Sequence, residues 1–356
     1  HNSQKKKGQS LLTKLLISAI TLILCALGVL LPQEEGETLP VSGGSLTVHF
    51  IDVGQADCAL LACGGQTMLI DGGNVDDSQL VVSYLDQMGV QKLNYVVCSH
   101  AHEDHVGGLA AVLAKYPADR VYSPVTAYSS KAFSDFAKKA QAQGLSLTVP
   151  SPGERFSLGE ASVVILGPVK EYEQTNNTSI VLKVSYGQSD FLFTGDMETT
   201  AERDMLDYWQ DQGFEAEVLK VGHHGSNTSS GYRLLYYTDP DYGVISVGTG
   251  NSYGHPHEEP LSRFRDAGMV ILRTDELGHI IARTDGQDIT FTWQNQNAQP
   301  ADVEPGDGTD FYGNKKSHKF HDASCKNLPS EQNRIVFSNY GQAIAQGYEP
   351  CGSCIR

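Results

Sequence analysis

The stretch Ser99-His100-Ala101-His102-Glu103-Asp104-His105 places three histidines and two carboxylates within seven residues, directly after an apolar run at residues 95–98. A strand that ends in such a turn presents imidazole and carboxylate groups together, which suits two adjacent divalent cations. Without a cation, polar groups crowded in this way would desolvate and repel one another. The stretch therefore predicts a metal site around which the rest of the chain is organised.

Three further apolar runs end in residue types that bind metals. Each run has the composition of a strand and is followed within three residues by a carboxylate or an imidazole. These residues are Asp71 after residues 67–70, Asp196 after residues 191–194, and the pair His223 and His224 after residues 218–221. We expect Asp196 to bridge two cations and Asp71 to orient a ligating histidine.

The length and composition fit one large globular domain with accessory segments, because 40% of the 356 residues are hydrophobic. The formal charge of −16 makes the molecule as a whole repel nucleic acid unless metals or a local basic patch reverse the field.

Several strands in each half, with helices between them, predict an α+β fold of two packed sheets with helices outside, a four-layer αββα sandwich. The expected strands are residues 46–51, 58–61, 67–70, 95–98, 163–166, 179–184, 191–194, 218–221, 244–247 and 269–272, and the expected helices are residues 76–88, 131–143, 198–212 and 259–267.

The N-terminus has the order of a membrane-targeting segment. Three lysines at residues 5–7 precede an apolar run at residues 15–31, and a polar segment follows. This order predicts a signal peptide or signal anchor at residues 1–31, with a membrane contact if it stays uncleaved. Residues 32–44 are expected to be a linker, and the protein is expected to be extracytoplasmic, either membrane-anchored or secreted.

A small module of opposite charge ends the chain. Residues 45–293 are expected to form the main domain, residues 294–310 a second linker, and residues 311–356 a module with six basic and three acidic residues. Its ligand-type residues form two short-spaced pairs, His321 with Cys325 and Cys351 with Cys354. This set predicts a structural tetrahedral zinc, which a module of this size needs to stay folded. A disulfide between two of the cysteines is the alternative.

In this order the motifs of residues 45–293 resemble the metallo-beta-lactamase fold superfamily of metal-dependent hydrolases. Within it, His-Val-Gly-Gly at residues 105–108, His-His-Gly-Ser at residues 223–226, Asn-Ser-Tyr-Gly-His-Pro at residues 251–256 and Phe-Ile-Asp-Val-Gly-Gln-Ala-Asp at residues 50–57 are similar to the hydrolase domain of ComEC/Rec2-type competence proteins, which internalise DNA. Residues 314–354 resemble the zinc-binding module related to the N-terminal part of the Ada DNA-repair protein, a module often appended to secreted nucleases.

The resemblance implies two metal positions. One metal would be held by His100 and His102, and Asp196 would bridge it to the second. The ligands of the second would be Asp104, His105 and one of His223 and His224. Many superfamily members supply a further histidine before the bridging aspartate, where this chain has Asn176-Asn177-Thr178-Ser179. The first metal is then short of a protein ligand, so one Zn²⁺ or two are compatible with the sequence, and Mn²⁺ is a further candidate.

The catalytic roles follow from phosphodiester chemistry. Asp104 or Asp196 would orient a hydroxide for in-line attack on a phosphodiester, and His255 would contact the phosphate or protonate the leaving oxygen. Asn177 and Ser226 are expected to support the ligands without binding metal. For Ser226 and His255, purely structural roles in their turns are the alternatives.

The sequence therefore predicts a metal-dependent phosphodiesterase or nuclease that acts on DNA and is related to competence DNA processing. One alternative is a phosphoesterase for cell-wall or choline-containing substrates. Another is a DNA-capture protein without catalysis, in which the C-terminal module binds. The motifs around His223 and His255 disfavour beta-lactam hydrolysis.

Overall fold

A computed structural model describes residues 44–300, 310–323, 325–352 and 354. The expected targeting segment, nearly all of the first linker and most of the second lie outside these residues. Within the described ranges, no helix is both long enough and apolar enough to cross a membrane.

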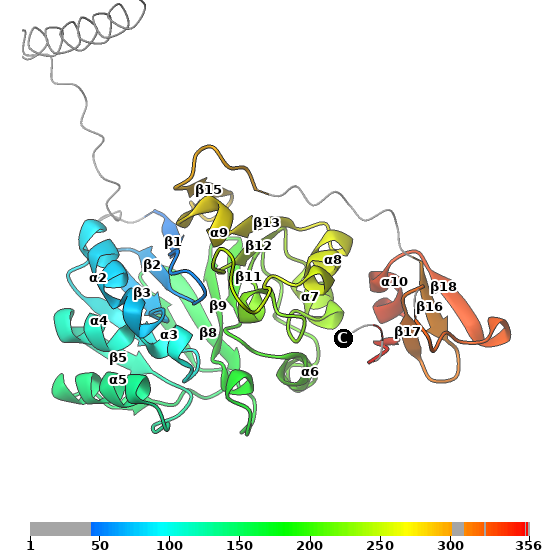
Figure 1. Ribbon diagram of the computed structural model, residues 1–356, viewed down its shortest axis with the longest axis horizontal. Coiled ribbons are helices and arrows are strands. Elements are labelled where there is room, and N and C mark those ends of the chain that lie inside the picture. Colours follow the sequence, from blue (N-terminus) through cyan, green and yellow to red (C-terminus); the bar gives the residue numbers. More distant parts are fainter. Residues whose placement is uncertain (1–43, 301–309, 324, 353, 355–356) are drawn as a thin grey trace, which may run out of the picture. The chain divides into compact units, whose positions relative to one another are not determined.

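Two large mixed sheets build the part of the structure formed by residues 44–300 (Figure 1). The first sheet has the strand order β15 (Ile289–Trp293), β14 (Ile280–Thr284), β1 (Leu46–Phe50), β2 (Ala59–Cys63), β3 (Gln66–Ile70), β4 (Leu93–Val97), β5 (Ala118–Tyr122) and β6 (Leu147–Thr148). The second has the order β13 (Val270–Arg273), β12 (Tyr242–Ile245), β11 (Val218–Lys220), β10 (Ser189–Phe193), β9 (Val181–Tyr186), β8 (Ala161–Gly167) and β7 (Arg155–Leu158). Strands β3 to β6 are parallel to one another, as are β10 to β13.

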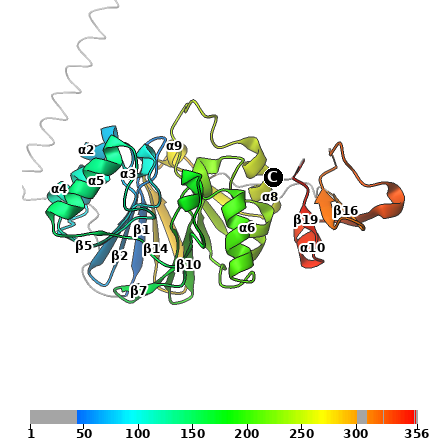
Figure 2. The same ribbon diagram turned by 90° about the horizontal axis from the view of Figure 1, so that it is seen from below.

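Helices cover the outer faces of both sheets (Figure 2). The first sheet packs against α2 (Ser78–Gln87), α4 (Leu109–Lys115) and α5 (Lys131–Ala142). The second packs against α6 (Thr199–Tyr208), α7 (Tyr232–Thr238) and α8 (Glu258–Asp266). The inner faces share one apolar core that includes Phe50, Phe191 and Phe193. The α+β fold with two packed sheets is therefore confirmed.

Every strand and helix expected from the sequence has a counterpart within a few residues. The prediction missed α7 and the strands β5, β6, β7, β14 and β15. These strands are short or alternate polar with apolar residues. The hairpin of β14 and β15 returns to the first sheet, where β14 pairs antiparallel with β1. The C-terminal end of this domain therefore completes the sheet that its N-terminal end begins.

Two glycines let the histidine turn pack against the chain that follows β3. The short helix α3 (Glu103–Val106) is separated from α4 by Gly107 and Gly108. A Cβ at Gly108 would lie 2.1 Å from the carbonyl oxygen of Gly72, and one at Gly107 would lie 2.3 Å from the nitrogen of Val75. Any larger residue would push the turn out of place.

The C-terminal module has its own small sheet and core. Its strand order is β18 (Arg334–Phe337), β16 (Phe311–Asn314), β17 (Lys319–His321) and β19 (Glu349–Pro350), and α10 (Tyr340–Ala345) follows β18 in the chain. Phe311, Phe320, Phe337 and Tyr340 are buried together.

Candidate metal centre

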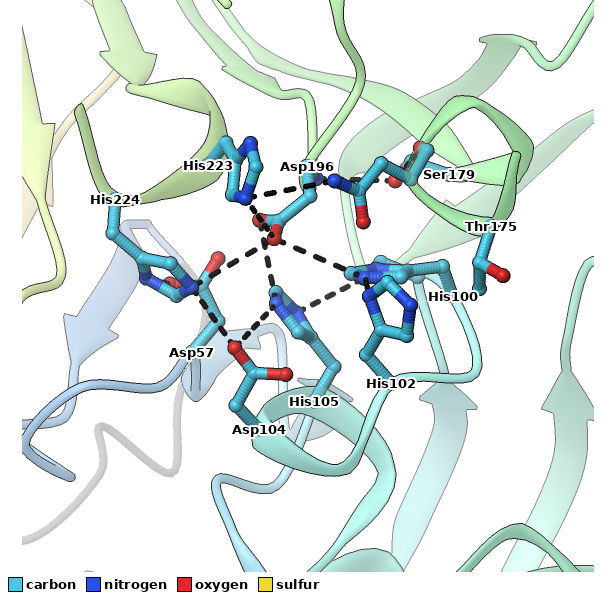
Figure 3. A network of polar contacts seen from close by, with 12 residues as sticks. Asp57, His100, His102, Asp104, His105, Thr175, Ser179, Asp196, His223 and His224 are labelled. Atoms are coloured by element: carbon cyan, nitrogen blue, oxygen red, sulfur yellow. Dashed lines mark hydrogen bonds and ion pairs between the residues drawn. The ribbon is translucent and has the colours of Figure 1, made fainter. Parts of the chain in front are cut away.

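The predicted ligands of the histidine turn, Asp196 and the pair His223 and His224 meet at one place (Figure 3), and Asp71 contacts His105 there. Strands β3 and β4 of the first sheet lead to Asp71 and to the histidine turn. Strands β10 and β11 of the second sheet lead to Asp196 and to the pair His223 and His224. Because each pair of strands is parallel, the carboxyl ends share one edge of their sheet, which is where ligands bind in such sheets.

Four of these residues form a compact ligand set. Ligand atoms of Asp104, His105, Asp196 and His224 all lie within 4.8 Å of one another. His105 Nε2 is 3.3 Å from Asp196 Oδ1, and His224 Nε2 is 3.2 Å from Asp104 Oδ2. Among the described residues, His105 Nε2 and Asp196 Oδ1 are buried and have no hydrogen-bond partner. Since a buried polar atom without a partner costs about 1–3 kcal/mol, the set fits a divalent cation that both atoms can bind.

The charges around this ligand set call for a cation. Burial opposes the charged form of His105, but Asp196, Asp104 and Asp71 overcome it and raise the pKa of His105 well above its ordinary value. Burial likewise opposes the charged form of His224, and the carboxylates, Asp196 first, raise its pKa to about 10. Burial opposes ionisation of Asp196, yet these histidines hold its pKa well below the usual range. The carboxylates thus favour positive charge here, which a divalent metal supplies.

Contacts behind the ligands fix which ring nitrogen faces the centre. Asp71 Oδ2 accepts a hydrogen bond from His105 Nδ1 at 2.8 Å, the arrangement that its predicted orienting role requires. Asp71 also accepts bonds from the backbone and the hydroxyl of Ser99, both at 2.7 Å. His224 Nδ1 donates to the carbonyl oxygen of Ser246 at 2.9 Å. Both histidines therefore direct Nε2 toward the ligand set.

A buried ion pair behind His224 was missed by the sequence analysis. Asp57 Oδ2 lies 2.8 Å from Lys220 Nζ, and both residues are buried. The other carboxylate oxygen lies 3.4 Å from His224 Nδ1. The position of Asp57 at the end of the opening motif, shortly after a buried strand, was the available signal.

The residues implied for the first metal lie beside Asp196, more loosely than the second set. His100 Nε2 is 3.1 Å from His102 Nδ1 and 3.8 Å from Asp196 Oδ2. His223 Nε2 is 3.7 Å from the same Asp196 oxygen, and its Nδ1 contacts Thr228 Oγ1 at 3.1 Å. His223 and His224 both have left-handed backbone angles, with φ of 51° and 52°. Such strain is typical of residues whose side chains are held for function.

The two predicted supporting residues act on the loops next to the ligands. Asn177 Oδ1 accepts a hydrogen bond from the backbone of Glu198 at 3.1 Å. Ser226 Oγ lies 3.1 Å from Thr228 Oγ1. Both residues are buried, and these contacts hold neighbours of Asp196 and His223 in place.

A pocket of about 380 Å³ opens onto the ligands and includes His255 in its wall. The amide nitrogen of Gln55 donates to His255 Nδ1 at 3.2 Å, and the amide oxygen of Gln55 accepts from the backbone of Gly248 at 3.1 Å. Burial, then the nearby histidines, lower the pKa of His255 to about 4. The ring is therefore neutral with Nε2 as its N–H donor. Tyr253, 67% exposed, stacks on His255 with ring centroids 5.6 Å apart.

A second ligand set lies in the C-terminal module. Ligand atoms of His321, Cys325, Cys351 and Cys354 lie within 4.8 Å of one another. His321 Nδ1 is 3.3 Å from Cys325 Sγ. Among the described residues, none of these three cysteines forms a disulfide. The four side chains that the sequence singled out are thus gathered as a tetrahedral zinc requires.

Sequence comparison agrees with the fold and these two sites. Residues 51–249 match the Metallo-beta-lactamase superfamily, and residues 293–355 match the Metal binding domain of Ada. The chain therefore belongs to the metallo-beta-lactamase superfamily, as a metal-dependent hydrolase related to competence proteins.

Two competence proteins are similar in sequence to this chain. ComE operon protein 3 of Bacillus subtilis (strain 168) is 26% identical over 264 residues, which are 69% of this chain and 34% of that protein. Competence protein ComA of Neisseria gonorrhoeae is 32% identical over 243 residues, which are 68% of this chain and 32% of that protein. The chain thus spans about a third of their length. Among solved structures, the metallo-beta-lactamase fold protein YhfI from Bacillus subtilis aligns with a TM-score of 0.44 and 12% identity, covering 65% of this chain and 96% of that one.

Proposed function

We propose that this protein is an extracytoplasmic phosphodiesterase that cleaves DNA. The observation that carries the proposal is the pocket whose wall contains Asp104, Asp196 and His224 of the ligand set together with His255 and the exposed Tyr253. A divalent cation on this set supplies Lewis acidity, which stabilises charge on a phosphoryl group and lowers the pKa of water. Lysines 5–7 and the apolar run at residues 15–31 support an extracytoplasmic location.

Other side chains around the pocket have separate roles in binding the substrate. The neutral ring of His255 donates a hydrogen bond from Nε2 to a phosphoryl oxygen, since Gln55 occupies Nδ1, and its low pKa disfavours the proposed protonation of the leaving oxygen. The exposed face of Tyr253 offers a stacking surface for a nucleobase, whichever base it is. The net charge of −16 opposes DNA binding, whereas the C-terminal module carries an excess of three positive charges and acts as a tether.

The test compares substrate classes on the purified chain with Zn²⁺ or Mn²⁺ added. We expect cleavage of DNA, with loss of at least about 1,000-fold in the Asp104→Ala/His105→Ala double variant, because both remove ligands. The exposed pair on α5, Lys131→Ala/Asp135→Ala, is the matched control and should keep full activity. Undiminished cleavage by the first double variant would contradict the proposal.

Two other functions give different results in the same assay. A phosphoesterase for cell-wall or choline-containing substrates hydrolyses p-nitrophenyl phosphorylcholine or bis-p-nitrophenyl phosphate and leaves DNA intact. A DNA-capture protein binds DNA without turnover under any metal, and it loses binding when residues 311–356 are deleted. Hydrolysis of a chromogenic cephalosporin would point to beta-lactams.

A further inference from the structure

Asn176 lies in the pocket with its amide oxygen unused. The residue belongs to the short helix η2 (Thr175–Thr178), it is only 7% exposed, and it lines the pocket together with His102 and Asp196. Its Oδ1 is buried and has no hydrogen-bond partner anywhere in the described ranges. A buried acceptor without a partner destabilises the fold unless something in the pocket binds it.

The neighbours of Asn176 fix the direction of its amide. Its Nδ2 donates to Glu198 Oε1 at 3.1 Å and lies 3.5 Å from His223 Nε2. Turning the amide over would place Oδ1 against the Glu198 carboxylate, where two acceptors repel. The oxygen, not the nitrogen, therefore remains for a ligand in the pocket.

The predicted metal ligands beside Asn176 are one fewer than a tetrahedral ion needs. His100 and His102 point adjacent ring nitrogens at each other, 3.1 Å apart, and Asp196 Oδ2 lies 3.8 Å from His100 Nε2. These residues supply three donor atoms, whereas a tetrahedral ion takes four. Asn177, the predicted supporting residue, already accepts the backbone N–H of Glu198 with its Oδ1. Asn176 is the member of the pair with a free oxygen.

We propose that Asn176 Oδ1 is a ligand of the cation held by His100 and His102. This inference rests on the metal-centre part of the proposed function and deepens it. An amide oxygen is a harder ligand than an imidazole nitrogen, so it shifts the preference of this position from Zn²⁺ toward Mn²⁺. The other position, with His105 and His224, keeps two imidazoles and has no such shift.

His223 is the competing donor for the same cation. Its Nε2 lies 3.7 Å from Asp196 Oδ2, and its Nδ1 is engaged by Thr228. Its side chain is 22% exposed, so water can reach it. The orphaned oxygen of Asn176 has no comparable alternative among the described residues, which decides between the two.

The test counts ions and does not depend on turnover. The full chain is freed of metal, dialysed against Mn²⁺ or Zn²⁺, and analysed for bound metal by mass spectrometry and for bound Mn²⁺ by electron paramagnetic resonance. We expect Asn176→Ala to weaken one Mn²⁺ site by at least about 10-fold. Asn176→Asp should keep or tighten it, and Asn176→His should turn its preference toward Zn²⁺. Asn227→Ala, in the neighbouring loop, is the control and should match the unchanged chain.

Two results would overturn the inference. One is a Mn²⁺ affinity that does not fit an oxygen ligand: either Asn176→Ala binds Mn²⁺ as tightly as the unchanged chain, or Asn176→Asp loses as much Mn²⁺ affinity as Asn176→Ala. The other is loss of the same site in His223→Ala alone, with Asn176→Ala unaffected. If the unchanged chain binds these ions but leaves DNA intact, the proposed function fails while this inference stands.

Discussion

His105 Nε2 and Asp196 Oδ1 face each other at 3.3 Å, and within the described chain neither atom has a hydrogen-bond partner (Figure 3). Both side chains are almost completely buried, and they come from different sheets. The two packed sheets therefore bring together two buried ligand atoms that a cation between them can bind. A metal site at this pair accounts for the many imidazole and carboxylate groups in the turn at residues 99–105.

Asp71→Asn should weaken metal binding without unfolding the chain. Asparagine tolerates the left-handed φ of 60° at this position. Its NH₂ group, however, accepts no hydrogen bond, so asparagine cannot accept the bonds that both Asp71 oxygens accept from His105 Nδ1 and from Ser99. Loss of such an orienting contact typically weakens metal affinity by about 10- to 100-fold. Chelator competition with Zn²⁺ measures the change, and the exposed Asp76→Asn should show none. Equal affinities for the two variants would count against an orienting role.

Tyr253→Ala should weaken binding of single-stranded DNA by about 1–3 kcal/mol, since the exposed ring is proposed to stack on a base. Tyr253→Phe keeps the stacking face and should bind normally. Fluorescence anisotropy with a labelled oligonucleotide measures both. Tyr208→Ala, another exposed tyrosine on α6, is the control. If Tyr253→Ala binds as tightly as Tyr208→Ala, the ring takes no part in DNA binding.

Glu202→Gln should remove a pH dependence of stability. Burial raises the pKa of Glu202 to about 7, although its carboxylate accepts the backbone N–H groups of Ser230 and Gly231. The folded state therefore keeps a proton that the unfolded state releases near pH 4.5. Stability from this group is complete below about pH 4.5 and falls by up to about 3 kcal/mol as the pH rises to about 7.

Urea unfolding between pH 4.5 and 7.5 tests this sign. The free energy of unfolding of the unchanged chain should fall with pH more steeply than that of Glu202→Gln. Glu215→Gln alters an exposed carboxylate and should keep the original slope. Identical slopes in all three proteins would rule out the raised pKa.

Cys351→Ser should remove one zinc ion per chain and loosen the C-terminal module. Its thiol belongs to the set with His321, Cys325 and Cys354, and small modules of this kind depend on their metal for folding. Metal analysis and limited proteolysis of residues 311–356 measure the two effects. The exposed Ser317→Ala in the same module should retain the zinc. Unchanged zinc content in Cys351→Ser would instead favour a disulfide between the other two cysteines.

The sequence predicted those parts of the metal centre that depend on short stretches of consecutive residues. Asp71, Asp196 and His224 lie within four residues of the end of a buried strand, and His105 lies in the turn that follows β4, so each apolar run and the polar residues after it are visible together. The carboxyl ends of parallel strands lie at the same edge of a sheet, so the convergence of the residues that follow them is predictable. The two-sheet fold and the gathering of the four module ligands followed from equally local patterns.

The missed features depend on contacts between distant residues. Pairing of β14 with β1 joins residues more than two hundred positions apart, and no local pattern specifies it. Lys220 lies within a strand, and nothing in its neighbourhood indicates a buried partner such as Asp57. Asn176 and Asn177 are adjacent and alike, and only their contacts in the folded chain distinguish Asn176, which lines the pocket, from Asn177, whose Oδ1 accepts from the backbone of Glu198.

DNA cleavage by metal-depleted protein tests the central claim most directly. The purified chain is stripped of metal, supplied with end-labelled single-stranded DNA, and followed before and after addition of Mn²⁺ or Zn²⁺, beside the Asp196→Ala variant. We predict no cleavage before metal is added, cleavage afterwards, and none at any time by Asp196→Ala, which removes the carboxylate that faces both ligand groups. Cleavage by the stripped protein at the full rate, or by Asp196→Ala as fast as by the unchanged chain, would contradict the account.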